Sequence, residues 1–172
     1  MTTAAHHPRL RFASAIGLLA ALLLLLVPML EAPADASTAT TARVTARGMT
    51  PNQQRVVNDI NASRRSRGKH NLTSSRLMNQ RAQGWAQHLA SCQCLEHRAG
   101  PYGAPGGWCA AAENVGRSGN GGQLGALHFA FMRSSGHRAN ILNSRWTAVG
   151  VGVARDRAGE YFVVHAFADF SC

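Results

Sequence analysis

Acidic residues are scarce in this 172-residue chain, since 8 Asp and Glu stand against 18 Lys and Arg and give a formal net charge of +10. Lysine is scarcer still, because Lys69 is the only one and the other 17 basic side chains are arginines. Aromatic residues make up only 6% of the chain. Because the arginines are scattered, the aromatics are few and no recognition motif occurs, we expect no nucleic-acid partner.

Familiar catalytic signatures are also missing. The stretch 116–120 (Gly-Arg-Ser-Gly-Asn) lacks the last glycine of a GxSxG nucleophile elbow, and 150–155 (Gly-Val-Gly-Val-Ala-Arg) lacks the last glycine of a GxGxxG dinucleotide loop. The zinc-protease motif HExxH does not occur. Any chemistry must therefore be inferred from individual residues.

The N-terminal segment has the layout of a secretory signal. Arg9 and Arg11 precede an uncharged apolar run over residues 12–30, and Ala34-Asp-Ala36 offers a small-residue cleavage site. The predicted organisation is a signal peptide over 1–36, a flexible Ser-, Thr- and Ala-rich linker over 37–49, and one domain over 50–172. We expect a secreted, extracellular protein; an uncleaved membrane anchor is the alternative, because the run is nearly long enough to span a bilayer.

The positive charge belongs to the predicted domain. Arg9 and Arg11 are offset by Glu31 and Asp35, so removing residues 1–36 leaves the net charge unchanged. A basic exported domain is expected to adhere to anionic surfaces such as cell-wall polymers or phospholipid headgroups. A genome-wide arginine bias explains the composition equally well. We expect the domain to be a monomer.

Four cysteines follow the signal, and an even number in an exported chain predicts two disulfides. Residues two apart rarely meet disulfide geometry, so Cys92 with Cys94 is the least expected pair. We expect one of these two cysteines to bridge Cys109 and the other to reach Cys172. A zinc site from Cys92, Cys94, His97 and Cys109 is less favoured, because it lacks CxxC spacing and leaves Cys172 unpaired.

Periodicity predicts four helices and two strands. The helices are expected from a Thr50 cap to about 67, from 74 or 75 to about 91, over 122–133 and over 134–142, and the strands over 148–154 and 161–170. Gly150 and Gly152 leave one strand face bare, which lets another element approach closely. His165 is interpreted as a packed strand residue. Residues 92–121 are expected to form an ordered functional loop without regular structure.

A histidine lies at the turn between the third and fourth helices. Ser134 is the expected N-cap, which places His137 at the third position of the new helix. Unpaired backbone N–H groups and the positive end of the helix dipole disfavour an imidazolium there. A neutral imidazole suits a metal ligand or a general base. A half-buried, hydrogen-bonded structural histidine is the alternative.

Six motifs occur in an order that is specific as a set. They are Ile60-Asn61-x-x-Arg64, an isolated His97, Glu113-Asn114-Val115, the Ser-x-Gly-His-Arg-x-Asn-Ile-Leu stretch over 134–142, Val-Gly-Val-Gly over 149–152, and Tyr-x-Val-Val-x-x-Phe over 161–167. Together they resemble the compact bacterial branch of the CAP superfamily, named for cysteine-rich secretory proteins, antigen 5 and pathogenesis-related proteins. The resemblance covers about residues 51–170. It implies an α+β fold, a three-layer α-β-α sandwich with a small antiparallel sheet between helices.

The resemblance also implies a central cavity lined by two histidines and one or two acidic residues. By motif, these are His97, His137 and Glu113, and Ser134 stands where larger members have a second acidic residue. The usual Gly-Glu-Asn is Ala112-Glu-Asn here. The expected ligand-binding cleft therefore consists of His97, Glu113, Ser134 and His137, with the two histidines as ligands for a divalent metal such as zinc.

Members of the superfamily resemble secreted effector or binding proteins, several of them associated with sterols, lipids, membranes or cell walls. We therefore expect a secreted binding protein with a His- and Glu-lined cleft for a divalent metal or small ligand, and a basic surface for cell-envelope contacts. Binding is favoured over catalysis. The alternatives are a metal-dependent, peptidase-like hydrolase with Glu113 as candidate general base, and a lipid or sterol carrier.

Overall fold

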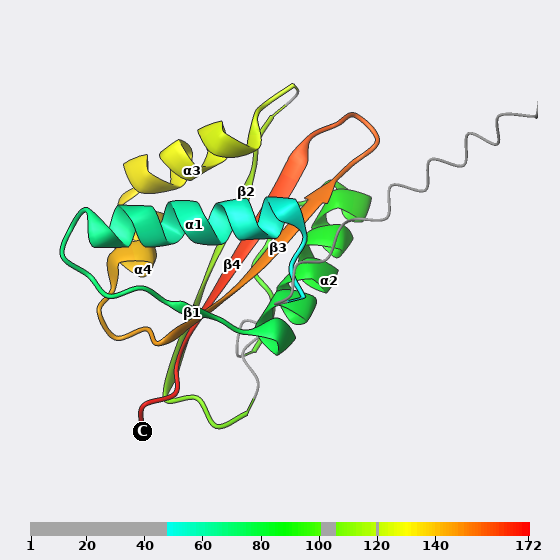
Figure 1. Cartoon of the computed structure of the whole chain (residues 1–172). Coiled ribbons are helices and arrows are strands. Elements are labelled where there is room, and N and C mark those ends of the chain that lie inside the picture. The colour runs from blue at the N-terminus through cyan, green and yellow to red at the C-terminus, as the bar shows by residue number, and fades with distance from the viewer. Residues whose placement is uncertain (1–47, 101–105, 120) are drawn as a thin grey trace, which may run out of the picture. The chain divides into compact units, whose positions relative to one another are not determined.

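The computed structural model describes residues 48–100, 106–119 and 121–172 (Figure 1), so the predicted signal peptide and nearly all of the predicted linker lie outside the described residues. In this part of the chain the elements are, in order, α1 (Pro51–Arg65), β1 (Thr73–Ser74), α2 (Arg76–Cys92), β2 (Ala110–Arg117), α3 (Leu124–Arg133), α4 (Ser135–Leu142), β3 (Ala148–Arg155) and β4 (Tyr161–Asp169). None of these helices combines the length and apolar character needed to cross a bilayer.

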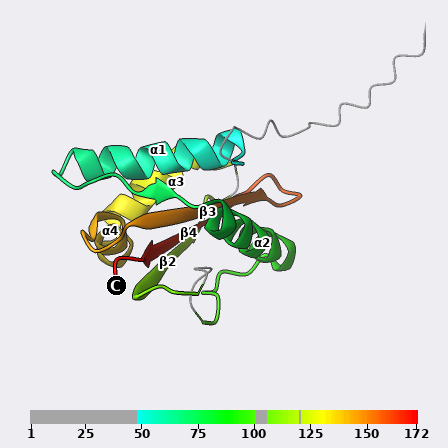
Figure 2. The same cartoon turned by 60° about the horizontal axis from the view of Figure 1, so that its bottom comes forward.

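The strands form one sheet in the order β1-β3-β4-β2. Helices α1, α3 and α4 cover one face and α2 covers the other (Figures 1 and 2). The α+β class and the three-layer α-β-α sandwich are therefore confirmed. The sheet is mixed, because β2 and β3 pair antiparallel with β4 whereas β1 pairs parallel with β3.

Alternation along the strands builds two cores. In β4, Val163 and Phe167 pack with α1, α3 and α4, whereas Phe162 and Val164 pack with α2. Successive strand residues point to opposite faces, so one strand supplies both layers. Every one of these four side chains is at most 1% exposed.

The α2 layer lies unusually close to the sheet. A Cβ on Gly150 would lie 2.4 Å from the Cβ of Met78, and a Cβ on Gly152 would lie 2.0 Å from the carbonyl oxygen of Ala82. No side chain fits in that space. The prediction that these glycines admit a closely packed element is confirmed, and the element is α2.

Side chains complete the outer edge of β3 beyond the short β1. The backbone N–H groups of Val151 and Val153 donate to Asn79 Oδ1 (2.8 Å) and Gln83 Oε1 (3.0 Å). Their carbonyl oxygens accept from Gln53 Nε2 (2.8 Å) and Gln83 Nε2 (2.9 Å). Amide side chains from both helical layers thus replace a neighbouring strand along this edge.

The start of α1 follows its predicted cap. The Thr50 hydroxyl accepts from the Gln53 N–H, and the Gln53 side chain accepts from the Thr50 N–H, which is a complete capping box. Gln53 therefore serves both the cap and the edge of β3. Met49 is fully buried, so the packed core includes the residue before the cap.

The prediction of a loop without regular structure over 92–121 is wrong, because β2 lies within it. The strand begins Ala-Ala-Ala and continues through Glu113 and Asn114, so the sequence has no apolar alternation to indicate it. All eight residues nevertheless pair with β4, from Ala110 opposite Asp169 to Arg117 opposite Phe162. Tertiary pairing overrides weak local propensity here.

The predicted disulfide pairing is also wrong. Cys92 bonds to Cys94, and Cys109 bonds to Cys172. Gln93, after the end of α2, adopts a left-handed conformation (φ 53°, ψ 27°) that folds the chain back and leaves the two flanking Cα atoms 5.2 Å apart. This distance lies within the usual range for a disulfide.

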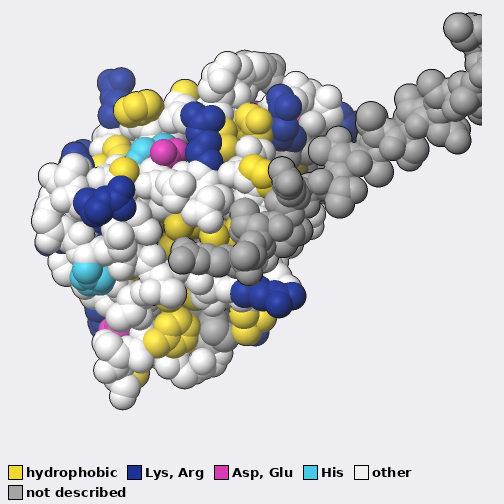
Figure 3. Space-filling view, in the orientation of Figure 1, with side chains coloured by type: hydrophobic (Ala, Val, Ile, Leu, Met, Phe, Trp, Pro, Cys, Tyr) yellow, Lys and Arg dark blue, Asp and Glu magenta, His cyan; other side chains and the backbone are white. Residues whose placement is uncertain are grey.

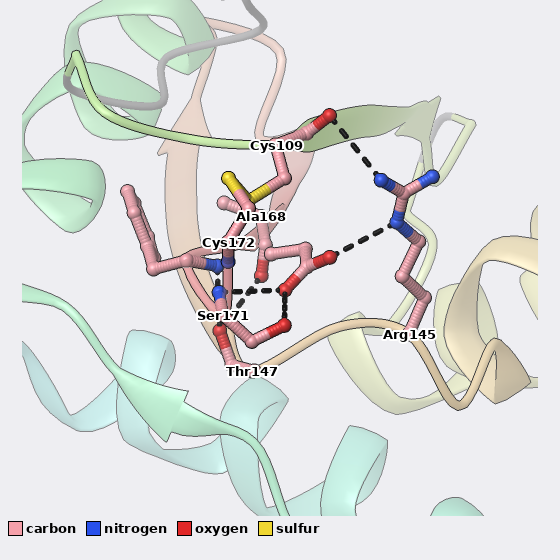
Figure 4. Close-up of a disulfide and its surroundings, with 8 residues drawn as sticks. Cys109, Arg145, Thr147, Ala168, Ser171 and Cys172 are labelled. Atoms are coloured by element: carbon pink, nitrogen blue, oxygen red, sulfur yellow. Dashed lines mark hydrogen bonds and ion pairs between the residues drawn. A yellow bond between two sulfur atoms is a disulfide. The ribbon is translucent and has the colours of Figure 1, made fainter.

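The second bond follows from the pairing of β2 with β4. Cys109 lies directly before β2, where its N–H donates to the Asp169 carbonyl oxygen at 2.8 Å, so the end of the chain lies beside it. Arg145 bridges the same region by donating to the Asp169 carboxylate (3.0 Å) and the Cys109 carbonyl oxygen (3.3 Å; Figure 4). The four-ligand zinc alternative does not assemble, because Cys109 is bonded to Cys172.

Candidate functional site

The site lies along β2, the strand at one edge of the sheet. Val115 packs with α2, and Glu113, two residues earlier, shares that face of the strand. Asn114 points to the opposite face and donates to the His137 carbonyl oxygen in α4 at 3.0 Å. The Glu-Asn pair therefore connects both helical layers around one edge of the sheet.

The structure brings His97 and Glu113 together. His97 Nδ1 lies 2.9 Å from Glu113 Oε1, and the Arg98 N–H donates to the same oxygen at 3.1 Å. The Glu113 side chain is 1% exposed, whereas that of His97 is 59% exposed. Burial raises the pKa of the Glu113 carboxyl, and the hydrogen bonds from His97 and Arg98 oppose that rise. The pair thus joins a buried carboxylate to an imidazole that faces solvent.

His137 reaches this edge from the α4 side. It is the third residue of α4, as predicted, and is half-buried with its ring edge-on to Phe131 at 5.0 Å between centroids. Burial lowers the pKa of His137, and the nearby charge of His97 lowers it further. This direction agrees with the expected preference for a neutral imidazole, but its main cause is burial and not the position at the start of the helix.

Ser134 occupies the N-cap position of α4, as predicted. The Ser134 side chain makes no capping hydrogen bond to the N–H groups of α4, all of whose residues the structure describes. The backbone carbonyl oxygen of Ser134 accepts from the Arg138 N–H at 2.9 Å, which starts the helix. A half-buried hydroxyl at this turn can interact with a ligand, but it cannot replace the negative charge of a carboxylate.

A chain of amide hydrogen bonds fixes α4 against β2. Asn140 Nδ2 donates to Asn114 Oδ1 (2.9 Å) and to the Glu113 carbonyl oxygen (3.3 Å). Trp146 Nε1 donates to the Asn140 carbonyl oxygen at 2.8 Å. Sequence reasoning did not assign these positioning roles, although both asparagines lie within the quoted motifs. Their roles could have been suspected from the sequence, because Asn114 lies in the same motif as Glu113 and Asn140 in the same motif as His137.

A fully buried arginine holds the other end of α4. Arg64 of α1 donates through Nη1 to the carbonyl oxygens of Ile141 and Asn143, both at 2.8 Å, and through Nε to the His70 carbonyl oxygen at 2.8 Å. Its side chain is completely buried. Burial lowers the pKa of Arg64. A cation at a helix C-terminus satisfies carbonyl groups that lack helical partners, so Arg64 helps to set where α4, and thus His137, lies.

Behind the site lies a second histidine environment. His165 is 1% exposed and packs on Phe131, with 4.6 Å between ring centroids. Its pKa is lowered to about 3 by burial, with smaller effects from the charges of His128 and His137. The interpretation of His165 as a packed strand residue is confirmed.

The predicted metal ligands are residue types that bind zinc, but the structure does not hold them in a compact arrangement. Among the described residues, a single group of three His, Cys, Asp or Glu ligand atoms lies within 4.8 Å of one another, and it consists of His88, Cys92 and Cys94. His97, Glu113 and His137 therefore do not form a compact three-ligand set. The structure instead shows a carboxylate that orients His97 through Nδ1, a common support for a metal-binding histidine.

The layers, the edge strand with its Glu-Asn pair and the histidine at the start of α4 together define a CAP-type domain. The sequence profile described as "Cysteine-rich secretory protein family" matches residues 57–167, and the chain belongs to this family. A curated relative, the uncharacterized protein YkwD of Bacillus subtilis, is 28% identical over 132 residues, which cover 71% of this chain. The match spans 50% of that relative's length.

Solved structures support the same fold. An outer surface protein of Borrelia burgdorferi superposes with a TM-score of 0.60 at 14% identity, covering 69% of this chain and 92% of that one. An extracellular protein of Bacillus anthracis that contains an SCP domain superposes with a TM-score of 0.56 at 24% identity, covering 69% of this chain and 40% of that one. At these identities the likeness establishes the architecture alone.

Proposed function

We propose that this chain is an exported CAP-domain binding protein whose edge site, formed by His97, Glu113, Ser134 and His137, takes a divalent ion or a small polar ligand. The observation that carries the proposal is the bond between the buried Glu113 carboxylate and the solvent-facing His97. Burial disfavours the charged form of the Glu113 carboxyl, so placing it there lowers the stability of the fold. Groups kept at such a cost beside an exposed imidazole are typical of binding sites.

The two histidines would supply the nitrogen donors for such an ion. Because Nδ1 of His97 is directed to Glu113, Nε2 would be its donor to an ion, and burial lowers the pKa of His137, which favours the neutral ring that a metal ligand needs. A bound divalent ion would polarise an oxygen of the ligand or a water molecule. Glu113, Asn114 and Asn140 hold the two imidazoles in place.

Binding is favoured over hydrolysis at this site. Ser134 stands where a second carboxylate would be needed for paired acid and base chemistry, and Oε1 of Glu113 already accepts from two donors. The raised pKa of Glu113 is the observation that favours a general-base role, so hydrolysis is the second candidate. Steady turnover of peptides or esters that disappears in His137→Ala would establish it.

Calorimetric titration with Zn²⁺ tests the binding proposal. The full chain is kept oxidised, so that both cysteine pairs remain closed. We expect one saturable site in the wild type, its loss in His97→Ala and His137→Ala, and about tenfold to hundredfold weaker binding in Glu113→Gln, which replaces the charged acceptor beside His97 by a neutral one. Gln80→Ala, an exposed α2 variant, is the matched control. Absence of Zn²⁺ binding in a folded chain would remove the metal from the proposal.

The basic surface supports envelope contact as part of the same proposal. Figure 3 shows many Lys and Arg side chains and few Asp and Glu side chains spread over the face drawn. A dispersed positive field attracts an extended anionic surface rather than a single small anion. We expect the chain to sediment with anionic phospholipid vesicles and to be released as the salt concentration is raised. It should not sediment with neutral vesicles. Retention at high salt would argue against an electrostatic contact.

A further inference from the structure

A second cluster of metal-binding side chains lies at the C-terminal end of α2. His88 and Cys92 are four residues apart on one face of the helix, and the left-handed Gln93 folds Cys94 back towards them. One ligand atom from each of His88, Cys92 and Cys94 lies within 4.8 Å of the other two. Three donors therefore converge over a stretch of seven residues.

The ring of His88 is held by two neighbours. It stacks on Trp85 with 4.6 Å between centroids and 20° between planes, and its Nε2 lies 3.4 Å from Glu96 Oε1. The side chains of His88 and Glu96 are 50% and 55% exposed, so solvent reaches the cluster. A carboxylate beside a histidine commonly orients it towards a metal or supplies a further oxygen ligand.

The chemistry of the cluster depends on the state of its sulfurs. In this structure Cys92 and Cys94 are bonded to each other, and a disulfide is a poor metal ligand. As two thiolates with an imidazole, the same residues would form a soft donor set that suits Zn²⁺. The oxidised and metal-bound states therefore exclude each other.

We propose that His88, Cys92 and Cys94 form a zinc site that becomes available when the Cys92–Cys94 disulfide is reduced, separate from the edge site on β2. A dithiol reductant transfers two electrons and two protons to the disulfide, becomes a disulfide itself and leaves two cysteine thiols. One Zn²⁺ then displaces the two thiol protons to solvent and forms two Zn–S bonds and one Zn–N bond. Water or Glu96 completes the coordination.

Position in the fold supports a metal over free thiolates. The last carbonyl groups of α2 carry a partial negative charge, which disfavours two thiolates at that helix end. A divalent cation reverses this effect by supplying a larger local positive charge. The sulfurs must move from bonding distance to about 3.8 Å apart around tetrahedral zinc, and Cys94 lies outside the helix, in the segment that follows Gln93.

The test uses the full-length double variant Cys109→Ser/Cys172→Ser, which retains only the proposed pair of cysteines. It is reduced with a dithiol, freed of reductant without oxygen, and titrated with Co²⁺ and then Zn²⁺. We expect one equivalent of Co²⁺ to give a thiolate-to-metal charge-transfer band, Zn²⁺ to displace it, and the oxidised protein to give no such band. His88→Ala should weaken Zn²⁺ binding at least about tenfold, whereas its neighbour Gln87→Ala should leave binding unchanged.

A second comparison keeps the proposal testable if that variant does not fold. Reduced wild type is compared with reduced Cys92→Ser/Cys94→Ser, since both contain Cys109 and Cys172. Equal thiolate bands in the two proteins, or equal Zn²⁺ binding by oxidised and reduced wild type, would overturn the proposal. Binding by the oxidised chain that is lost in His137→Ala reports on the edge site alone, so the two proposals fail independently.

Discussion

Arg64 is a buried cation that the chain pairs with carbonyl oxygens. Its guanidinium meets three carbonyl groups at 2.8 Å, from His70, Ile141 and Asn143. A planar group with five donors matches several acceptors at once, which an ammonium cannot do. Arg64 therefore joins α1, the segment before β1 and the end of α4.

Replacing this arginine should be among the most damaging single changes. In Arg64→Met the three carbonyl oxygens lose their donors inside the protein, so we expect a loss of about 3 kcal/mol in the free energy of unfolding, measured by urea denaturation. Arg64→Lys keeps the positive charge but not the planar guanidinium with its several donors, so it should lose less of the free energy of unfolding. Near-wild-type stability of Arg64→Met would show that water can replace the guanidinium.

Buried His165 should make the protein sensitive to acid. Its pKa is lowered to about 3 from an ordinary value of 6.5, so the unfolded chain binds this proton more readily than the folded one. Its contribution is complete above about pH 6.5 and is lost as the pH falls towards 3, at up to about 1.4 kcal/mol per pH unit. Burial also lowers the pKa values of His128 and His137, which adds to the loss.

The variant His165→Gln tests this pH dependence, because glutamine retains polar atoms but does not titrate. We expect its stability to fall less steeply than that of the wild type from about pH 7 to about pH 4, whatever its starting value. Replacing the exposed Gln87 by Ala, which alters no titratable group, should leave the slope as it is. Parallel curves for His165→Gln and wild type would assign the acid sensitivity to other groups.

At the scale of single residues, the sequence predicts those features that depend on neighbouring positions in the chain. The Thr50 capping box and the third-position placement of His137 depend on residues a few positions apart. The role of Arg64 depends on carbonyl groups more than 70 residues away, in Ile141 and Asn143. Such partners are brought together only by the fold, so no spacing within the sequence indicates them.

At the scale of elements, the contact of α2 with β3 is set by backbone atoms. Gly152→Ala would place a methyl group 2.0 Å from the Ala82 carbonyl oxygen, which cannot move without moving the helix. We expect a loss of about 3 kcal/mol in thermal or urea unfolding. Gly84→Ala is the matched control in α2, because nothing lies within 4 Å of its added Cβ and it should gain about 0.5 to 1 kcal/mol.

Strands β3 and β2 show which elements the sequence can and cannot predict. The bare face of β3 was visible because Gly150 and Gly152 alternate with valines. The β2 strand was invisible because alanines, a glutamate and an asparagine give no apolar period, although β2 carries the site. A functional strand is selected for its chemistry as well as its packing, which weakens its signal.

At the scale of the whole molecule, the two disulfides should differ in their effects on stability. Cys109 and Cys172 are 63 residues apart, so their bond restricts the unfolded chain by about 4 kcal/mol in the chain-entropy model. Cys92 and Cys94 are separated by 2 positions and close a very small loop. We expect Cys109→Ser/Cys172→Ser to lower the free energy of unfolding by about 4 kcal/mol and Cys92→Ser/Cys94→Ser by much less. Equal losses would contradict this account.

The order of six motifs predicted the family and its three layers, because that order reflects the path of the whole chain. Disulfide pairing was not predictable in the same way. It required the left-handed turn at Gln93 and the alignment of β2 with β4, neither of which the sequence displays. The general geometric rule against closely spaced cysteines was overridden by one residue's backbone conformation.

The row of amides along β3 has a consequence for the protein at high concentration. An unpaired strand edge can template pairing with another chain, and β3 is a valine-rich strand with a two-residue neighbour on that side. Asn79, Gln83 and Gln53 occupy the hydrogen-bonding groups that an incoming strand would need. We therefore expect these three amide side chains to hinder pairing of β3 with a second molecule. They belong to α1 and α2, the helices that also pack the core.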